Sequence, residues 1–357
     1  MMKILMLARP NLFDDPGGDT TQIVNTAEEL RKLGVAVDLN PPDPQYKNYD
    51  LLHFFNIIDP EDILGHLKKT DKPYVVSTIY LDYQEYDRYH RKDAIGWANR
   101  FLSYHGVEYL KTVGKWLLKG EPLSTYSYLW TGHRRSILKI IMGATCLLPN
   151  SESEYQRLVH DFGIKKEYVV IPNGVSPEKF SPLPPEERST ILCVSRIEGR
   201  KNHYNLIKAL RGTGLTLKIV GNSAKNQQKY YQRCREIADD NVHFLGYLSH
   251  EELCKQYAQA RVHALPSWFE TTGLVSLEAS LLGCNVVVGD RGDVRDYFRE
   301  DAWYCEPGDP SSIRKAILEA YEAPYDNNLS NRIKSEFNWR NASNLTFLAY
   351  QKALTCH

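Results

Sequence analysis

The sequence predicts an α/β fold built from two doubly wound domains, each with a parallel sheet covered by helices. Short apolar runs alternate with helical patterns along most of the chain, and this order is typical of strands joined by helical crossovers. A stretch at about residues 83–140 interrupts the alternation, and a proline-rich segment at residues 173–189 separates its two halves. The length of 357 residues fits two domains, since one domain usually takes about 100–200 residues.

Six apolar runs in the first half predict strands, beginning with MKILMLA at the N-terminus. The pattern QIVNTAEELRKLG then predicts a helix that ends at Gly34, because glycine commonly terminates helices. The remaining predicted strands are VAVDLN, YDLLHFFNI, PYVVSTIY, ATCLLPNS and YVVIPNG. Residues 83–140 are rich in Tyr, Trp, Arg and Lys and lack strand character, so they predict a helical insertion.

The alternation restarts with the strand ILCVS and the helix KNHYNLIKALRG, and it continues to the helical pattern PSSIRKAILEAYE. The predicted first domain is therefore 1–172, with the insertion, and the second is 173–337. A final helical pattern at 338–357 is expected to pack back on the first domain. Ligands of doubly wound domains bind beyond the carboxyl ends of the strands, so we expect functional residues in the loops that leave strands.

Composition narrows the classes of function. The 44 basic and 44 acidic residues give a formal net charge of zero, so no nucleic-acid partner is expected. Seven cysteines occur without a C-x-x-C pair, which is typical of reduced thiols in a cytoplasmic protein. No apolar run reaches the length of about 18 residues that a membrane span requires, and the apolar core of MMKILMLARP is too short for a signal peptide.

The segment at residues 266–290 joins a predicted strand to a predicted helix and carries two glutamates. Glu270 lies just after the strand, and Glu278 lies on the helix. A helix start near Gly273 offers free backbone N–H groups and a partial positive charge, which suit a diphosphate. A carboxylate on the helix can accept hydrogen bonds from two sugar hydroxyls. The alternative is a core helix capped by Thr271, with two solvated glutamates.

Two further loops carry features suited to anion binding. In VSRIEGRKN, Arg196 lies at a strand end and Lys201 just beyond it, so both can neutralise a diphosphate leaving group. In DDPGGDTTQ, Gly17 and Gly18 permit a ligand to approach the backbone at the start of the first helix. The alternatives are a solvated basic loop and a simple turn capped by Asp19 or Thr20.

Together these segments resemble the family-4 retaining glycosyltransferases, which have the GT-B architecture of two facing Rossmann-like domains with an interdomain cleft. Glu270 and Glu278 match the E-x7-E motif of that family. The likeness continues through PGGDTTQ, LPNS, IPNGVSPEKF, VSRIEGRKN and FLGYLSHEEL, in the family's linear order. The resemblance implies transfer of a sugar, with retention, from a nucleoside-diphosphate sugar to an acceptor hydroxyl, and UDP is the expected nucleotide.

The resemblance also implies roles for individual residues. Arg196 and Lys201 would hold the donor diphosphate, Glu270 would contact the transferred sugar, and Glu278 would bind the ribose hydroxyls. Backbone groups would complete the donor site at Gly18, Tyr247, Leu248, Gly273, Leu274 and Val275. The family needs no bound metal and no D-x-D motif occurs in a suitable loop, so neither a metal nor another cofactor is expected.

One departure from the family concerns the first-domain strand VVSTIYLDY. Many relatives carry a histidine after this strand, whereas this chain has Tyr80 and Asp82. Asp82 is therefore predicted to hydrogen-bond sugar or acceptor hydroxyls or to act as the acceptor base; the alternative is a loop cap. His53, within the strand LLHFFN, is expected to be packed. The missing histidine leaves open a nucleotide-sugar epimerase and a binding protein without catalysis.

The expected acceptor is a glycan, a glycolipid or a small molecule, in bacterial glycan or glycolipid synthesis. Residues 88–139 are basic, and the bases Lys115 and Lys119 lie beside aromatic and aliphatic residues such as Trp97 and Trp116. This mixture is typical of segments that bind anionic membranes, which predicts a peripheral location at the inner face of the membrane. The alternative is an ordinary amphipathic insertion that covers the sheet.

Overall fold

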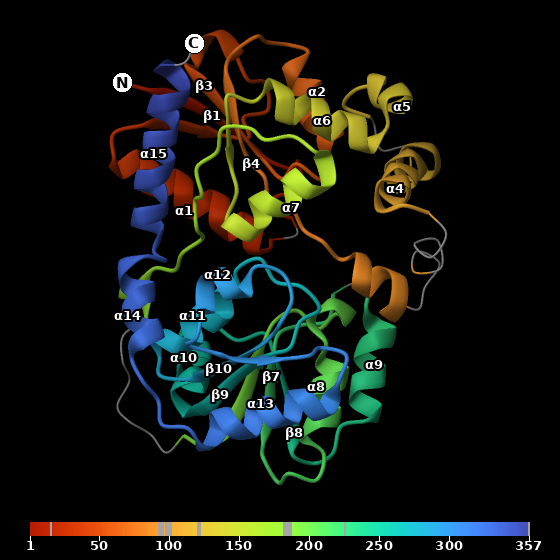
Figure 1. Ribbon diagram of the computed structural model, residues 1–357, viewed down its shortest axis with the longest axis vertical. Coiled ribbons are helices and arrows are strands. Elements are labelled where there is room, and N and C mark those ends of the chain that lie inside the picture. The colour runs from red at the N-terminus through yellow and green to blue at the C-terminus, as the bar shows by residue number, and fades with distance from the viewer. Residues whose placement is uncertain are drawn as a thin grey trace. The chain divides into compact units, whose positions relative to one another are not determined.

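The computed structural model describes residues 1–14, 16–91, 96, 102–119, 123–180, 188–224 and 226–355. The chain divides into two compact units: Met1–Asn173 together with Trp339–His357, and Gly174–Asn338. Each unit contains one parallel sheet with helices packed against it (Figure 1). The predicted α/β class is therefore confirmed.

The first unit has a five-stranded sheet in the order β2-β1-β3-β4-β5, and every pairing is parallel. The strands are β1 (Lys3–Leu7), β2 (Ala36–Leu39), β3 (Leu51–Phe55), β4 (Tyr74–Ser77) and β5 (Cys146–Leu148). The helices are α1 (Gly18–Lys32), α2 (Pro60–Leu67), α4 (Tyr104–Lys119), α5 (Ser127–Thr131), α6 (His133–Gly143), α7 (Glu152–Phe162) and α15 (Trp339–Thr355).

Successive side chains of each strand point to opposite faces of this sheet, and different helices cover the two faces. On one face, Leu5 and Leu52 pack with Ile140 of α6. On the other face, His53 of β3 is buried and its Nδ1 lies 2.6 Å from the hydroxyl of Tyr350 on α15. Helix α15 also packs along α1, so the final helix belongs to the first unit. The expectation that His53 is packed is confirmed.

One predicted strand is wrong. The run YVVIPNG contacts β5 through an isolated bridge at Tyr168. Two backbone hydrogen bonds follow, in which the amide of Val169 donates to the carbonyl of Leu147 and the amide of Ile171 to the carbonyl of Pro149. A proline follows Ile171 immediately, and proline has no amide to continue a ladder. The segment therefore follows the sheet edge without becoming a sixth strand.

The second unit has a six-stranded parallel sheet in the order β11-β10-β9-β6-β7-β8. The strands are β6 (Thr190–Val194), β7 (Leu217–Val220), β8 (Val242–Gly246), β9 (Ala260–Leu265), β10 (Asn285–Gly289) and β11 (Trp303–Cys305). The helices are α8 (His203–Leu210), α9 (Gln228–Glu236), α10 (His250–Gln259), α11 (Leu274–Leu281), α12 (Val294–Phe298), α13 (Pro310–Glu322) and α14 (Asn328–Ser335).

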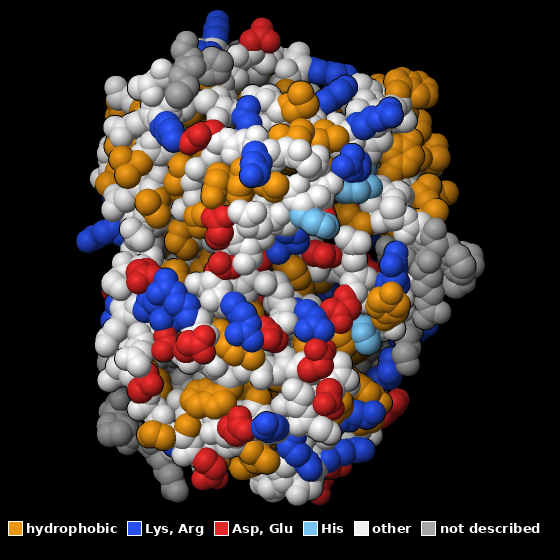
Figure 2. All heavy atoms as spheres, viewed as in Figure 1, with side chains coloured by type: hydrophobic (Ala, Val, Ile, Leu, Met, Phe, Trp, Pro, Cys, Tyr) orange, Lys and Arg blue, Asp and Glu red, His pale blue; other side chains and the backbone are white. Residues whose placement is uncertain are grey.

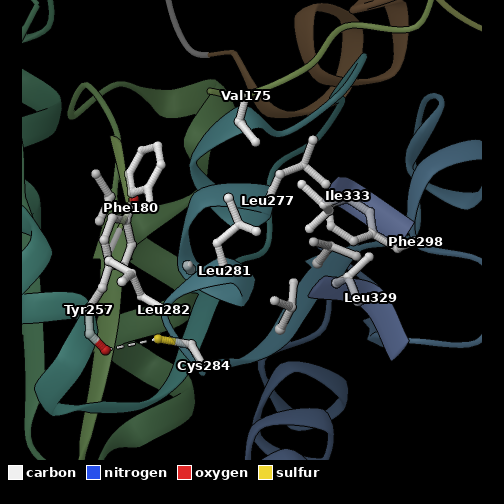
Figure 3. Close-up of a cluster of buried hydrophobic side chains, with 14 of the residues drawn as sticks. Val175, Phe180, Tyr257, Leu277, Leu281, Leu282, Cys284, Phe298, Leu329 and Ile333 are labelled. Carbon is white, nitrogen blue, oxygen red and sulfur yellow. Dashed lines mark hydrogen bonds between the residues drawn. The ribbon is translucent and has the colours of Figure 1, made fainter. Parts of the chain in front are cut away.

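The second sheet is also buried on both faces. Ile191 of β6 packs in a cluster with residues of α8, α9 and α13, whereas its neighbour Leu192 belongs to a cluster with α10, α11 and α14. Figure 3 shows this second cluster, in which Leu277 of α11 lies between the sheet and Ile333 of α14. Burial on two sides fixes α11, the helix that carries Glu278.

Candidate functional site

Loops from neighbouring strands meet at the carboxyl edge of the second sheet. β6 and β9 pair with each other, so the loops that leave them lie side by side. Lys201 lies in the loop after β6 and Glu270 in the loop after β9. The Nζ of Lys201 donates to Oε1 of Glu270 at 2.6 Å, and the two side chains are only 21% and 11% exposed. The fold thus joins two predicted site residues that are 69 positions apart.

Glu270 is held through its backbone by the loop after β10. The amide of Asp293 donates to the carbonyl oxygen of Glu270 at 2.8 Å. Gly292 lies alongside with φ +80°, and a Cβ there would meet that carbonyl oxygen at 2.1 Å. Only glycine fits this position. Gly292 was not among the site residues predicted from the sequence, although its place after a predicted strand was a signal.

Helix α11 begins behind Gly273, which has φ +69°. The cap is therefore Gly273, and Thr271, considered as the alternative cap, lies two residues earlier. The carbonyl of Gly273 accepts the amide of Leu277 at 3.2 Å. The amides of Leu274 and Val275 precede this bond and have no acceptor within the helix, so they can donate to an anion.

Glu278 lies one turn further along α11, half-buried between helices. Its Oε2 lies 3.3 Å from the hydroxyl of Tyr257 on α10, and this hydroxyl is also 3.1 Å from the carbonyl of Val275. Burial raises the pKa of Glu278 to about 7, because few waters remain to solvate the carboxylate. Tyr257 was not among the residues predicted from the sequence, because its helix lies outside the segment that carries Glu270 and Glu278.

The other predicted donor residues lie at the same edge of the sheet. Arg196 is exposed, two residues beyond the end of β6 and on the same loop as Lys201. Tyr247 follows β8 directly and is 79% exposed. Leu248 packs at the border of the cluster around Leu277.

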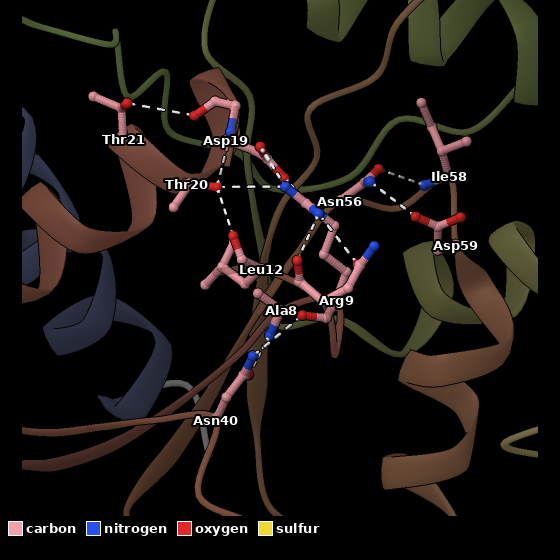
Figure 4. A network of polar contacts seen from close by, with 12 residues as sticks. Ala8, Arg9, Leu12, Asp19, Thr20, Thr21, Asn40, Asn56, Ile58 and Asp59 are labelled. Atoms are coloured by element: carbon pink, nitrogen blue, oxygen red, sulfur yellow. Dashed lines mark hydrogen bonds and ion pairs between the residues drawn. The ribbon is translucent and has the colours of Figure 1, made fainter. Parts of the chain in front are cut away.

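In the first unit, Arg9 organises the loop after β1. Its guanidinium donates to both carboxylate oxygens of Asp19, at 2.6 and 3.2 Å (Figure 4). Gly17 caps α1 and its amide donates to Oγ1 of Thr20 at 3.1 Å. Gly18 opens the helix, and a Cβ there would meet no atom within 4 Å. Packing within the unit therefore does not require glycine at position 18.

The loop after β4 is held by a buried carboxylate. Glu154 of α7 is fully buried and accepts hydrogen bonds from the hydroxyl of Thr78 and from the amides of Tyr80 and Asn150, the last two at 2.8 Å. Between Thr78 and Tyr80, Ile79 has φ +44°. This conformation costs a non-glycine residue about 1–3 kcal/mol, and the bonds to Glu154 on either side maintain it.

Tyr80 and Asp82 have different surroundings in this loop. Tyr80 is buried, and its hydroxyl donates to Oδ2 of Asp161 at 2.8 Å. Asp82 is partly exposed, and its Oδ1 accepts the amide of Gln84 at 2.9 Å. This contact is the loop cap that was the alternative to a catalytic role for Asp82. It uses one of the two carboxylate oxygens.

The helical insertion presents apolar side chains to solvent. We name the α4–α5 patch as Leu110, Leu117, Leu118, Tyr126 and Trp130, which are all exposed. Figure 2 shows apolar side chains gathered over α4 and α5. Lys115 is exposed beside them. Trp97 and the side chain of Lys119, both predicted from the sequence to take part in membrane binding, lie outside the described residues.

Within the described ranges, no group of three or more His, Cys, Asp or Glu side chains is arranged to hold a metal ion. Over the same residues, no helix is both long and apolar enough to cross a bilayer.

Comparison with known proteins identifies what the chain is similar to. Residues 175–336 match the family described as glycosyl transferases group 1. The GDP-mannose-dependent monoacylated alpha-(1-6)-phosphatidylinositol monomannoside mannosyltransferase of Corynebacterium glutamicum is 30% identical over 54% of this chain and 57% of its own length. Glycogen synthase of Mycobacterium tuberculosis is 27% identical over 52% of this chain and 49% of its own. The chain spans about half the length of these relatives.

Solved structures show the fold. Sucrose-phosphate synthase of Thermosynechococcus elongatus is similar over 100% of both chains, with a TM-score of 0.75 at 17% identity. Anabaena HepE, solved in complex with UDP and glucose, has a TM-score of 0.67 at 16% identity, over 98% of this chain and 100% of its own. These likenesses confirm the GT-B fold class. Residues 175–336, which carry Lys201, Glu270 and Glu278, are the part of the chain that matches the glycosyl transferases group 1 family.

Proposed function

We propose that the chain is a retaining hexosyltransferase that moves a sugar from a nucleoside-diphosphate donor to an acceptor hydroxyl. The observation that carries this proposal is the Lys201–Glu270 pair at the carboxyl edge of a glycosyl transferases group 1 domain. The start of α11 and the carboxyl of Glu278 lie on the segment that follows Glu270. Cation, free amides and carboxylates are the groups that a diphosphate, a sugar and a ribose require.

Catalysis in this proposal is electrostatic. Departure of the nucleoside diphosphate builds negative charge on its phosphate oxygens, and Lys201, Arg196 and the amides of Leu274 and Val275 stabilise that charge. The ammonium of Lys201 exchanges its bond to Glu270 for a phosphate oxygen when the donor binds. The carboxylate of Glu270 is then free to accept hydrogen bonds from the sugar hydroxyls.

The remaining groups have supporting roles in the same proposal. Backbone at Tyr247 and Leu248 meets the nucleobase, and the open space at Gly18 admits the diphosphate. The second oxygen of Asp82 accepts a hydrogen bond from an acceptor hydroxyl. No metal is required, because the cations and helix amides supply the positive charge.

The nucleotide is the first point to test. The family resemblance implies UDP, whereas the mannosyltransferase relative from Corynebacterium glutamicum is named for GDP-mannose. Thermal shift with UDP-, GDP-, ADP- and dTDP-sugars separates them, since a ligand at about 100-fold over its dissociation constant adds about 2.7 kcal/mol of stability. No shift with any of the four would contradict a donor site.

Turnover tests the assigned cations. We expect Arg196→Ala with Lys201→Ala to abolish release of nucleoside diphosphate. The charge-matched control is Lys255→Ala with Lys315→Ala, since both control lysines are more than half exposed. Near-normal activity in the first double variant refutes the site. Interconversion of free donor without acceptor identifies an epimerase, and binding without either reaction identifies a binding protein.

We also propose that the α4–α5 patch binds an anionic membrane surface, which gives a cytoplasmic protein peripheral at the inner face and access to a lipid-linked acceptor. Exposed leucines, Trp130 and Lys115 supply the apolar area and charge that interfacial helices use. Sedimentation with vesicles of anionic phospholipid should carry the protein down, and Lys115→Glu with Leu118→Ser should prevent it. The control is Lys315→Glu with Leu318→Ser, the same residue types at the same spacing on exposed α13 positions. Equal loss in both pairs, or no sedimentation of the wild type, contradicts the proposal.

A further inference from the structure

Asn202 follows Lys201 directly and is bonded in a way that the sequence did not reveal. It ends the 3-10 turn η4 (Gly199–Lys201) with φ +63°, and its side chain is buried. Its Nδ2 donates to the carbonyl of Pro266 at 3.0 Å and to the carbonyl of Pro307 at 2.7 Å. Two such bonds use both N–H groups of a carboxamide.

The two carbonyls belong to two other loops at the same edge of the sheet. Pro266 follows β9 directly and opens the segment that carries Glu270, and Pro307 lies two residues beyond β11. The amide of Trp268 donates to the carbonyl of Arg200 at 2.9 Å, which joins the β6 and β9 loops a second time. The side chain of Asn202 therefore links the β6 loop to the β9 loop at the residue next to Lys201.

We propose that Asn202 is a positioning residue of the donor site, which holds the β6 loop against the β9 loop so that the ammonium of Lys201 lies on Glu270 before a nucleoside diphosphate binds. Its effect on turnover rests on the proposed function, whereas the coupling of the two loops does not. Asparagine suits the position because it tolerates the left-handed conformation and offers two donors. Glycine provides the conformation but no side chain, and aspartate provides the conformation and the shape but neither N–H donor.

Three variants separate these properties: Asn202→Gly, Asn202→Asp and the control Asn205→Ala. Asn205, on α8, donates to the same Pro307 carbonyl at 3.0 Å, and that bond does not involve the β9 loop. We expect kcat at saturating donor to fall by about tenfold or more in both Asn202 variants, since small displacements of catalytic groups have effects of this order. The control should retain kcat within about twofold.

Wild-type kcat in Asn202→Gly would overturn the proposal, because the backbone conformation would then suffice. Equal loss of kcat in Asn205→Ala would also overturn it, because any lost bond to Pro307 would then have the same effect. Far-UV circular dichroism establishes that each variant folds. If Asn202→Gly does not fold, Asn202→Asp carries the same measurements.

Hydrogen exchange at the amide of Trp268 supplies a readout that needs no turnover. This amide spans the two loops, so its exchange should accelerate by about tenfold in Asn202→Gly and stay unchanged in Asn205→Ala, as local opening sets exchange rates. A wild-type protein without transferase activity refutes the proposed function alone. Unchanged Trp268 exchange in Asn202→Gly refutes the positioning role itself.

Discussion

If Glu278 binds the donor ribose as proposed, its carboxyl should make donor binding sensitive to pH near neutrality. Its pKa is raised to about 7 by burial, and in the proposed site a ribose hydroxyl donates to the ionised form. The ionised fraction is about one-eleventh at pH 6 and about ten-elevenths at pH 8, so donor affinity should rise about tenfold over that range. A tenfold change corresponds to about 1.4 kcal/mol of binding free energy.

Isothermal titration of a nucleoside-diphosphate sugar at pH 6, 7 and 8 measures this change. Glu278→Gln keeps the shape of the side chain and cannot ionise, so its affinity should be weaker at pH 8 and nearly independent of pH. Any titration of the ligand itself affects both proteins equally and cancels between them. An equal pH dependence in wild type and Glu278→Gln would refute the assignment of Glu278 to the ribose.

The same shift has a consequence for folding in the absence of donor. Because the folded-state pKa of Glu278 is about 7 and its ordinary value is 4.5, the folded chain holds this proton more tightly than the unfolded chain. The stabilisation is fully present below about pH 4.5, declines as pH rises, and is lost above about pH 7. Its upper limit is about 3 kcal/mol. Urea unfolding at pH 5 and pH 8 should show a smaller decline in Glu278→Gln than in wild type, and identical declines would contradict this.

Further predictions concern packing and the loop after β4. Leu277→Ala leaves a cavity in the cluster of Figure 3 and should lower the free energy of unfolding by about 2–5 kcal/mol; a loss below about 1 kcal/mol in urea titration would show that the site collapses. Glu154→Gln replaces one acceptor oxygen by an NH2 group, which cannot accept the hydrogen bonds that Thr78, Tyr80 and Asn150 donate, and it should cost about 2–3 kcal/mol. Faster proteolysis near Ile79 than in Glu152→Gln, an exposed control on the same helix, would support that origin, and equal rates would contradict it.

Local patterns predicted most of the fold, because the residues within a short segment largely determine whether it forms a strand or a helix. The runs MKILMLA and ILCVS became β1 and β6, since buried parallel strands are continuous apolar segments. The exception, YVVIPNG, shows the limit of such patterns, because one proline within the run decided against a strand. Asp82 illustrates the same point. The sequence places this residue in the loop after the strand, but only the structure shows that its carboxylate accepts the amide of Gln84.

Contacts between distant segments account for what the sequence did not show. Asn202 reaches a carbonyl 105 positions away, and Tyr257 meets Glu278 across 21 positions and two helices. Neither Pro307 nor Tyr257 lies within a motif, so no spacing pattern points to these partners. Gly292 is required by a carbonyl oxygen of the Glu270 loop, and that neighbour is known only once the sheet order is known.

The course of the chain bears on the order in which the protein folds during synthesis. The second unit is one continuous stretch, Gly174–Asn338, whereas the first needs Trp339–Thr355 to complete it. Domains generally fold as units while the ribosome extends the chain, so the second unit can finish before the first, although it is translated later. Until α15 emerges, the face of the first sheet around His53 lacks its cover. A released chain truncated after Asn338 should therefore present a folded second unit and a first unit open to proteases and chaperones.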